Sequence, residues 1–169
     1  MDGTTNFVHG HPHFCVSIGV CFQGTVVLGI VYAPVYKELF VAGENQGAQL
    51  NGDPIVVSKT SVLQRSLIAG GFPYERGEKL VPIIEQVSRV LLSCQGFRRA
   101  GSAALDLCYV AAGRLDGYWE SSIQAWDIAA GAIIVAQAGG MVSGYDGGEY
   151  DLFGREIIAT NGHIHAELM

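Results

Sequence analysis

The pattern of apolar residues changes once along this chain of 169 residues, near residues 58–65. Before that point, apolar and β-branched runs are separated by short turn sequences such as Gln23-Gly24-Thr25 and Asn51-Gly52-Asp53-Pro54. Strands joined by such short turns pair with their neighbours in the sequence. We therefore predict an antiparallel meander whose strands cover residues 14–22, 26–32, 38–42 and 55–57.

Strand and helix signals alternate in the rest of the chain. A helical period is predicted over residues 77–93, and two further helices over 103–112 and 128–138. Short apolar runs between them predict strands at residues 66–69, 97–99, 115–119, 141–143 and 157–160. We therefore expect an α+β or α/β layered sandwich, with a strand-rich section at 1–60 and an α/β domain at 61–169.

The composition narrows the classes of partner. Charged residues make up 15% of the chain and apolar residues 49%, against about 25% charged in an average domain. Either both sheets are covered on both faces, or one face packs on a further segment or a second subunit. The net charge is −6 and Arg98-Arg99 is the one basic cluster, so we expect no nucleic-acid partner.

The sequence predicts neither a membrane span nor a visible signal peptide. No run of 18 apolar residues occurs, and the residues after Met1 lack a basic region followed by an apolar one. We expect a cytoplasmic location, unless a targeting peptide precedes the residues printed here. The cysteines lie in apolar settings without Cys-x-x-Cys spacing, so we expect them to be reduced and buried.

The histidines of the segment His9-Gly10-His11-Pro12-His13 are close enough to suggest zinc. Pro12 makes the segment extended or turned, and no cysteine or fourth ligand is nearby in the sequence. We therefore interpret these histidines as structural or solvent-facing.

The first candidate site is Asp2-Gly3-Thr4-Thr5, which we expect to form a compact polar turn. The Asp2 carboxylate is a hard oxygen donor suited to Mg²⁺. The backbone N–H groups of Gly3 and Thr4 could together face an anion, and the threonine hydroxyls could orient a water or a phosphate oxygen. The same residues also make ordinary turns, so the stretch alone leaves both interpretations open.

Two later stretches add polar groups at helix starts. Asp127 falls in the first turn of a predicted helix, where the helix dipole favours a carboxylate, and Glu120 ends a predicted strand seven residues earlier. Ser102 stands at an N-cap position. Each residue also has a purely structural interpretation. Asp127 could be only an acid at a helix start, Glu120 a solvated loop acid and Ser102 a simple helix cap.

Taken in order, the three motifs resemble the inositol monophosphatase family, the Mg²⁺-dependent, lithium-sensitive sugar phosphatases. That family carries Asp-Pro-x-Asp-Gly-Thr, then Gly-Ser/Thr-Ala, then Trp-Asp-x-Ala-Ala-Gly. The matching segments here are residues 1–4, Gly101-Ser102-Ala103 and Trp126-Asp127-Ile128-Ala129-Ala130-Gly131. The resemblance implies the αβαβα-type fold of the family with its N-terminal portion missing. Residues 1–60 would then be the strand-rich end of the metal-site domain.

The resemblance also implies roles for particular residues. Asp2 and Asp127 would share one Mg²⁺, and the carbonyl oxygen of Met1 would reach a neighbouring Mg²⁺. Thr4 would position the attacking water. The substrate-binding residues would be Gly3 and Thr4 for the phosphate, and Gly101, Ser102, Ala103 and Glu120 for the polyol.

The implied activity is hydrolysis of inositol monophosphates by metal-activated water, in a protein that is commonly a homodimer. Related families act on histidinol phosphate, fructose 1,6-bisphosphate or 3′-phosphoadenosine 5′-phosphate. The first Asp and the Pro of the first motif are absent here, as is the Glu-Glu motif that the family carries upstream. A catalytically impaired fragment of the family is therefore the main alternative. A plain α/β domain with accidental motif matches is a further one.

Overall fold

The first sheet of the protein is an antiparallel meander of five strands in sequence order. The computed structural model describes residues 1–73 and 80–169. Within them the sheet contains β1 (Val16–Phe22), β2 (Thr25–Ala33), β3 (Glu38–Gly43), β4 (Ala48–Leu50) and β5 (Asp53–Ile55). The predicted meander is thus confirmed.

Two details of that prediction were wrong. The short strand β4 was not predicted, because three residues are too few to show a period. The last strand ends at Ile55 instead of covering 55–57. The Val57 N–H leaves the sheet and donates to the carbonyl oxygen of Ala138 at 3.2 Å.

The second sheet is mixed, with the strand order β7-β6-β8-β10-β9. Strand β6 runs parallel to β7 and β8, whereas β10 is antiparallel to β8 and β9. All five predicted strands appear in it. Strand β9 (Met141–Ser143) has the predicted ends, and the other four have ends shifted by one or two residues: β6 (Leu67–Gly70), β7 (Gly96–Arg98), β8 (Gly117–Ser121) and β10 (Glu156–Thr160).

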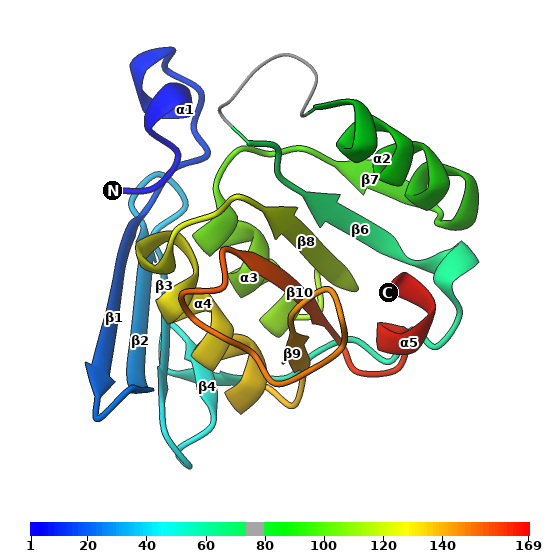
Figure 1. The fold of residues 1–169 in the computed structure, drawn as a ribbon. Helices are drawn as coiled ribbons and strands as arrows, with labels where there is room; N and C mark the ends of the chain where they lie inside the picture. The colour runs from blue at the N-terminus through cyan, green and yellow to red at the C-terminus, as the bar shows by residue number, and fades with distance from the viewer. Residues whose placement is uncertain (74–79) are drawn as a thin grey trace.

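Two helices, α3 (Ala103–Ala111) and α4 (Ala125–Gln137), lie between the sheets. Helix α2 (Val81–Ser93) lies on the other side of the second sheet, as Figure 1 shows. Predicted helical residues 77–79 lie outside the described part of the chain. The order of layers is sheet, helices, sheet, helix, which confirms a layered α+β fold.

Small residues let the inner helices sit against each other and against the first sheet. A Cβ atom on Gly131 of α4 would lie 2.5 Å from Cδ1 of Leu107 on α3, and a Cβ on Gly29 would lie 2.5 Å from the carbonyl oxygen of Ala130. Side-chain atoms do not approach that closely, so only glycine fits at either position. Helix α3 is therefore buried along nearly all of its length, and α4 is buried in its central part from Ala130 to Val135.

The outer face of the first sheet is apolar and uncovered. Its exposed side chains include Val16, Ile18, Val20 and Tyr32, which are 40–49% exposed. The second sheet is covered on both faces and the first on one. That the exposed face of the first sheet packs on a further segment or a second subunit stays a prediction.

Three further features differ from expectation. Residues Thr4–Val8 form the short helix α1 instead of a simple turn. Cys21 is exposed, since its side chain lies at the free end of the β1–β2 hairpin, and Cys94 is only part-buried. Cys15 and Cys108 are buried as expected.

Every helix in residues 1–73 and 80–169 is too short or too polar to cross a bilayer.

The C-terminal helix α5 (His165–Leu168) is anchored through a buried histidine. His165 Nε2 lies 2.8 Å from Ser143 Oγ, and Nδ1 lies 2.9 Å from Thr160 Oγ1. Ser143 donates its only hydroxyl hydrogen to the carbonyl oxygen of Gly144, so its oxygen is left to accept from Nε2–H. Burial lowers the pKa of His165 below its ordinary value.

We expect His165 to make stability depend on pH. Because its pKa is lowered in the folded state, the unfolded chain binds a proton more readily, and stability falls as the pH drops below about 6.5. Urea unfolding at several pH values between 7.5 and 5.5 should show a smaller decline in His165→Gln than in the unaltered chain. His163→Gln, at an exposed position nearby, is the control. An equal decline in all three proteins would contradict this assignment.

We also expect Gly29→Ala to destabilise the fold by about 1–3 kcal/mol, because the added methyl group overpacks the contact with α4. Urea unfolding would measure it. Thr25→Ala, at the exposed start of the same strand, should change stability by less than about 0.5 kcal/mol. Equal effects of both substitutions would show that the close contact does not limit stability.

Candidate functional site

The first three residues fold back onto the start of β1. Asp2 forms an isolated β-bridge with Cys15: the Asp2 nitrogen lies 2.9 Å from the Cys15 carbonyl oxygen, and the Cys15 nitrogen lies 3.0 Å from that of Asp2. Gly3 has a positive φ of 79°. A Cβ atom there would lie 2.8 Å from the carbonyl oxygen of His13, so the position requires glycine. The group that approaches Gly3 closely is thus the backbone of the same chain, at His13 and Phe14.

The Asp2 carboxylate lies at the N-terminus of α3. Its Oδ2 accepts hydrogen bonds from Ser102 Oγ at 2.6 Å and from the Ala104 N–H at 2.9 Å. Its Oδ1 accepts one from the N–H of Gly3 at 2.8 Å. Ser102 is the predicted N-cap and accepts from the Leu105 N–H. Asp2 and Ser102 thus satisfy two of the free N–H groups of this helix start, those of Ala104 and Leu105.

Asn6 holds the first motif against the second, and sequence reasoning did not single it out. Its Nδ2 donates to the carbonyl oxygens of His13 at 2.7 Å and Ala100 at 2.9 Å. Gly101 beside it has a φ of 91°. Because Asn6 lies 94 residues from Ala100 in the sequence, only the folded chain shows this clamp.

Glu120, at the end of β8, is buried against the backbone of Gly71. A Cβ atom at Gly71 would overlap the Glu120 carboxylate. The hydroxyl of Tyr118 donates to Glu120 Oε2. Burial raises the pKa of Glu120 to about 7, and the nearby Arg99 opposes the rise. Glu120 is therefore a part-buried, oriented acid rather than a solvated loop residue.

Asp127 lies in the first turn of α4, as predicted, and its N–H donates to the carbonyl oxygen of Gln124 at 3.0 Å. Burial raises the pKa of this half-buried carboxyl, and the negative charge of Asp2 raises it further. The loop before it contains Ser122 with a φ of 61°, which is unusual for a residue with a side chain and typical of functional sites.

These groups meet in one pocket of about 80 Å³. Of the residues singled out from the sequence, the pocket is lined by Asp2, Gly101, Ser102, Ala103, Glu120 and Asp127. Met1, Gly3 and Thr4 adjoin Asp2 in the sequence but do not line it. Met1 is 61% exposed, and Thr4 is exposed at the start of α1.

The pocket also contains residues whose role the sequence did not suggest. Asp106 lines the pocket and is 3% exposed, and its Oδ1 lies 3.7 Å from His13 Nε2. Burial raises the pKa of Asp106, and His13 opposes the rise. Arg99 also lines the pocket and stacks over the Phe72 ring at 5.5 Å. The signals in the sequence were slight: Asp106 is an acid within an otherwise apolar helix, and Arg99 is one of two adjacent arginines.

The charge in the pocket suits a cation. Among the residues that the structure describes, it is lined by the carboxyl groups of Asp2, Asp106, Glu120 and Asp127 and by the guanidinium of Arg99. In the described residues, His, Cys, Asp and Glu side chains form no group of three or more that could hold a metal ion. Mg²⁺ is commonly held by one or two carboxylates with waters and substrate phosphate completing its shell. Asp2 and Asp127 fit that limited donor set.

Comparison with known proteins supports the same chemistry. The family model described as the inositol monophosphatase family matches residues 1–169. A Synechocystis protein named inositol-1-monophosphatase is 51% identical over 168 residues, which are 99% of this chain and 58% of that protein. The Escherichia coli protein named Nus factor SuhB is 44% identical over 97% of this chain and 61% of its own length.

Solved structures show the same fold. The inositol monophosphatase from Anabaena (Nostoc) superposes with a TM-score of 0.96 at 46% identity, covering 99% of this chain and 66% of that one. The present chain thus spans about three fifths of the length of the curated relatives described above. A family model over the whole chain and relatives at this identity leave one conclusion: the chain belongs to the inositol monophosphatase family, a family of phosphatases.

Proposed function

We propose that this chain carries part of the active site for Mg²⁺-dependent hydrolysis of inositol monophosphates to inositol and phosphate. The observation that carries the proposal is the meeting of Asp2, Glu120 and Asp127 with the N-terminus of α3 in one pocket. Residues from three separate motifs line it, as a site for a charged sugar phosphate requires. The protein would act on small soluble phosphate esters as a cytoplasmic homodimer.

Asp2 and Asp127 are the residues that would hold Mg²⁺, and the Met1 carbonyl oxygen would face a neighbouring ion. The raised pKa of Asp127 supports this, because burial and the nearby negative charge of Asp2 both disfavour its ionised form when no cation is bound. When bound, Mg²⁺ would lower the pKa of a water and neutralise charge on the phosphate and the leaving oxygen. Asp2 is already oriented by its hydrogen bonds to α3.

The phosphate would lie near Gly3 and Thr4. The Gly3 N–H donates to Asp2 Oδ1 in this structure, so it orients the Asp2 carboxylate. Thr4 opens α1, and the first N–H groups of a helix have no partner within it. In this proposal the Thr4 hydroxyl would hold a water for attack on phosphorus.

The inositol ring would lie between Glu120 and the Gly101–Ala103 segment. With its pKa at about 7, Glu120 is largely ionised above neutral pH and then accepts hydrogen bonds from ring hydroxyls. The Tyr118 hydroxyl fixes its orientation. Gly101 and Ala103 leave space, and Ser102 adds a hydroxyl.

Two alternatives have support in the chain. Histidinol phosphate, fructose 1,6-bisphosphate and 3′-phosphoadenosine 5′-phosphate also carry a phosphate beside hydroxyl or amine groups that an acid can bind. A catalytically impaired fragment is favoured by the small donor set, since two carboxylates hold a hydrated Mg²⁺ weakly.

The first experiment measures phosphate release from inositol 1-phosphate by the 169-residue chain, with and without Mg²⁺ and with added Li⁺. It distinguishes the main proposal from the two alternatives. Release that needs Mg²⁺ and is blocked by Li⁺ supports the main proposal.

We expect Asp127→Asn to abolish Mg²⁺-dependent phosphate release and to weaken Mg²⁺ binding in isothermal titration, because the amide carries no charge. Asp53→Asn, at an exposed position of β5, should change neither. Activity retained in Asp127→Asn would remove this residue from the metal site. If the unaltered chain binds Mg²⁺ without turnover, the titration alone tests the assignment and the impaired-fragment alternative stands.

We expect Gly71→Ala to displace the Glu120 carboxylate, because the methyl group would occupy its place. KM for inositol 1-phosphate should rise about tenfold, the loss of roughly one charge-assisted hydrogen bond. The kcat/KM for nitrophenyl phosphate, which lacks ring hydroxyls, should change little. Gly96→Ala, where the nearest atom to the new Cβ is a side-chain methyl, serves as control. Equal losses with both substrates would argue against a role of Glu120 in binding hydroxyls.

A further inference from the structure

The side chain of Asn6, in the short helix α1, joins two segments that are far from each other in the sequence. Its Nδ2 donates to the carbonyl oxygen of His13 at 2.7 Å and to that of Ala100 at 2.9 Å. A side-chain amide nitrogen carries two hydrogens, so both of them are used. The two hydrogen bonds therefore connect the segment before β1 with the loop before α3.

Each of the two carbonyl groups lies directly behind a part of the proposed substrate site. The His13 carbonyl oxygen is the atom that a Cβ on Gly3 would meet at 2.8 Å, so this backbone supports Gly3. Ala100 precedes Gly101, which lines the pocket. In the proposed function Gly3 lies beside the phosphate and Gly101 beside the inositol ring. Asn6 thus connects the two ends of the site.

Gly101 needs such support, because a glycine backbone has many accessible conformations and this one has a φ of 91°. On one side of it the Ser102 hydroxyl is bonded to Asp2. On the other side the Ala100 carbonyl is bonded to Asn6. A Cβ on Gly101 would lie 3.0 Å from Asn6 Nδ2, so the amide also packs against the glycine itself. Gly101 is therefore anchored on both sides.

The hydrogen bond to Ala100 also sets the direction of the next N–H group. The peptide between Ala100 and Gly101 is trans, and the carbonyl and N–H of a trans peptide point in opposite directions. Since the Ala100 carbonyl is turned toward Asn6, the Gly101 N–H is turned away from it. Within residues 1–73 and 80–169 this N–H donates to no protein acceptor, so it is available to an oxygen of a ligand.

We propose that Asn6 is a positioning residue, which fixes the Ala100–Gly101 peptide so that Gly101 meets the substrate ring at a set distance from Gly3. This role rests on the proposed function. Inositol 1-phosphate contacts both ends of the site, so its binding depends on their spacing. A phosphate ester without ring hydroxyls contacts only the phosphate end and does not depend on Asn6.

Kinetics with two substrates test this role. Asn6→Ala removes both hydrogen bonds and should raise KM for inositol 1-phosphate about tenfold, while kcat/KM for nitrophenyl phosphate changes by less than about twofold. Asn6→Asp has the same shape but cannot donate, and should behave alike. The control is Asn51→Ala, which removes two side-chain hydrogen bonds, with Leu39 N–H and the Lys37 carbonyl, in an exposed turn. It should lower stability without altering either KM.

Backbone NMR relaxation of the substrate-free chain measures the anchoring itself. The order parameter of the Gly101 N–H should fall from about 0.85 to below about 0.6 in both Asn6 variants, but not in Asn51→Ala. The Ala104 N–H, held by Asp2, should keep its value. If the unaltered chain hydrolyses no inositol 1-phosphate, the proposed function fails and the order of Gly101 alone decides the role of Asn6.

Two results would overturn the proposal. One is a Gly101 N–H that is as ordered in Asn6→Ala as in the unaltered chain. The other is an equal loss of kcat/KM with inositol 1-phosphate and nitrophenyl phosphate in both Asn6 variants, which is the result expected of a residue that only stabilises the fold.

Discussion

The contact between the Asp2 carboxylate and the N-terminus of α3 is the interaction on which the site depends. One carboxylate oxygen of Asp2 accepts hydrogen bonds from the Ser102 hydroxyl and the Ala104 N–H. The other accepts one from the Gly3 N–H. The free N–H groups of a helix start favour a negative charge, so the helix holds an acid that burial would otherwise disfavour. Since α3 lies between the two sheets, the position of this acid is set by the packing of the whole interior.

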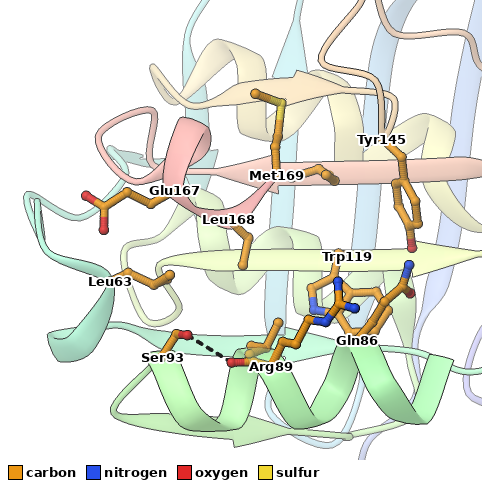
Figure 2. A pocket seen from close by; sticks show the side chains of 11 residues that line it. Leu63, Gln86, Arg89, Ser93, Trp119, Tyr145, Glu167, Leu168 and Met169 are labelled. Carbon is orange, nitrogen blue, oxygen red and sulfur yellow. Dashed lines mark hydrogen bonds between the residues drawn. The ribbon is translucent and has the colours of Figure 1, made fainter. Parts of the chain in front are cut away.

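That packing leaves little freedom. Gly29 and Gly131 permit backbone contacts that any side chain would prevent, and the core around α3 and α4 draws buried residues from both sheets. Asp127 on α4 therefore keeps a defined place relative to Asp2 on the segment before β1. Strand β8 contributes side chains to both faces of its sheet: Glu120 lines the candidate active site, and its neighbour Trp119 lines a pocket on the other face (Figure 2).

Much of the fold could be predicted from local patterns. The meander, the alternation of strands and helices, the Ser102 cap and the position of Asp127 in a first helical turn each follow from the residues within one or two turns. The errors have local causes too: β4 is too short to show a period, and Thr4–Val8 form a helical turn where a polar turn was expected. Cys21 lies in an apolar run but on an exposed hairpin.

The sequence by itself determined which chemical groups are available, namely the acids of the three motifs, and which elements carry them, because periodicity and capping are local properties. Only the tertiary structure decided that Asn6 clamps Ala100, that Gly71 makes room for Glu120, and that Asp106 and Arg99 join the pocket. These residues are far apart in the chain, and burial, charge proximity and steric exclusion act only between groups that folding has brought together.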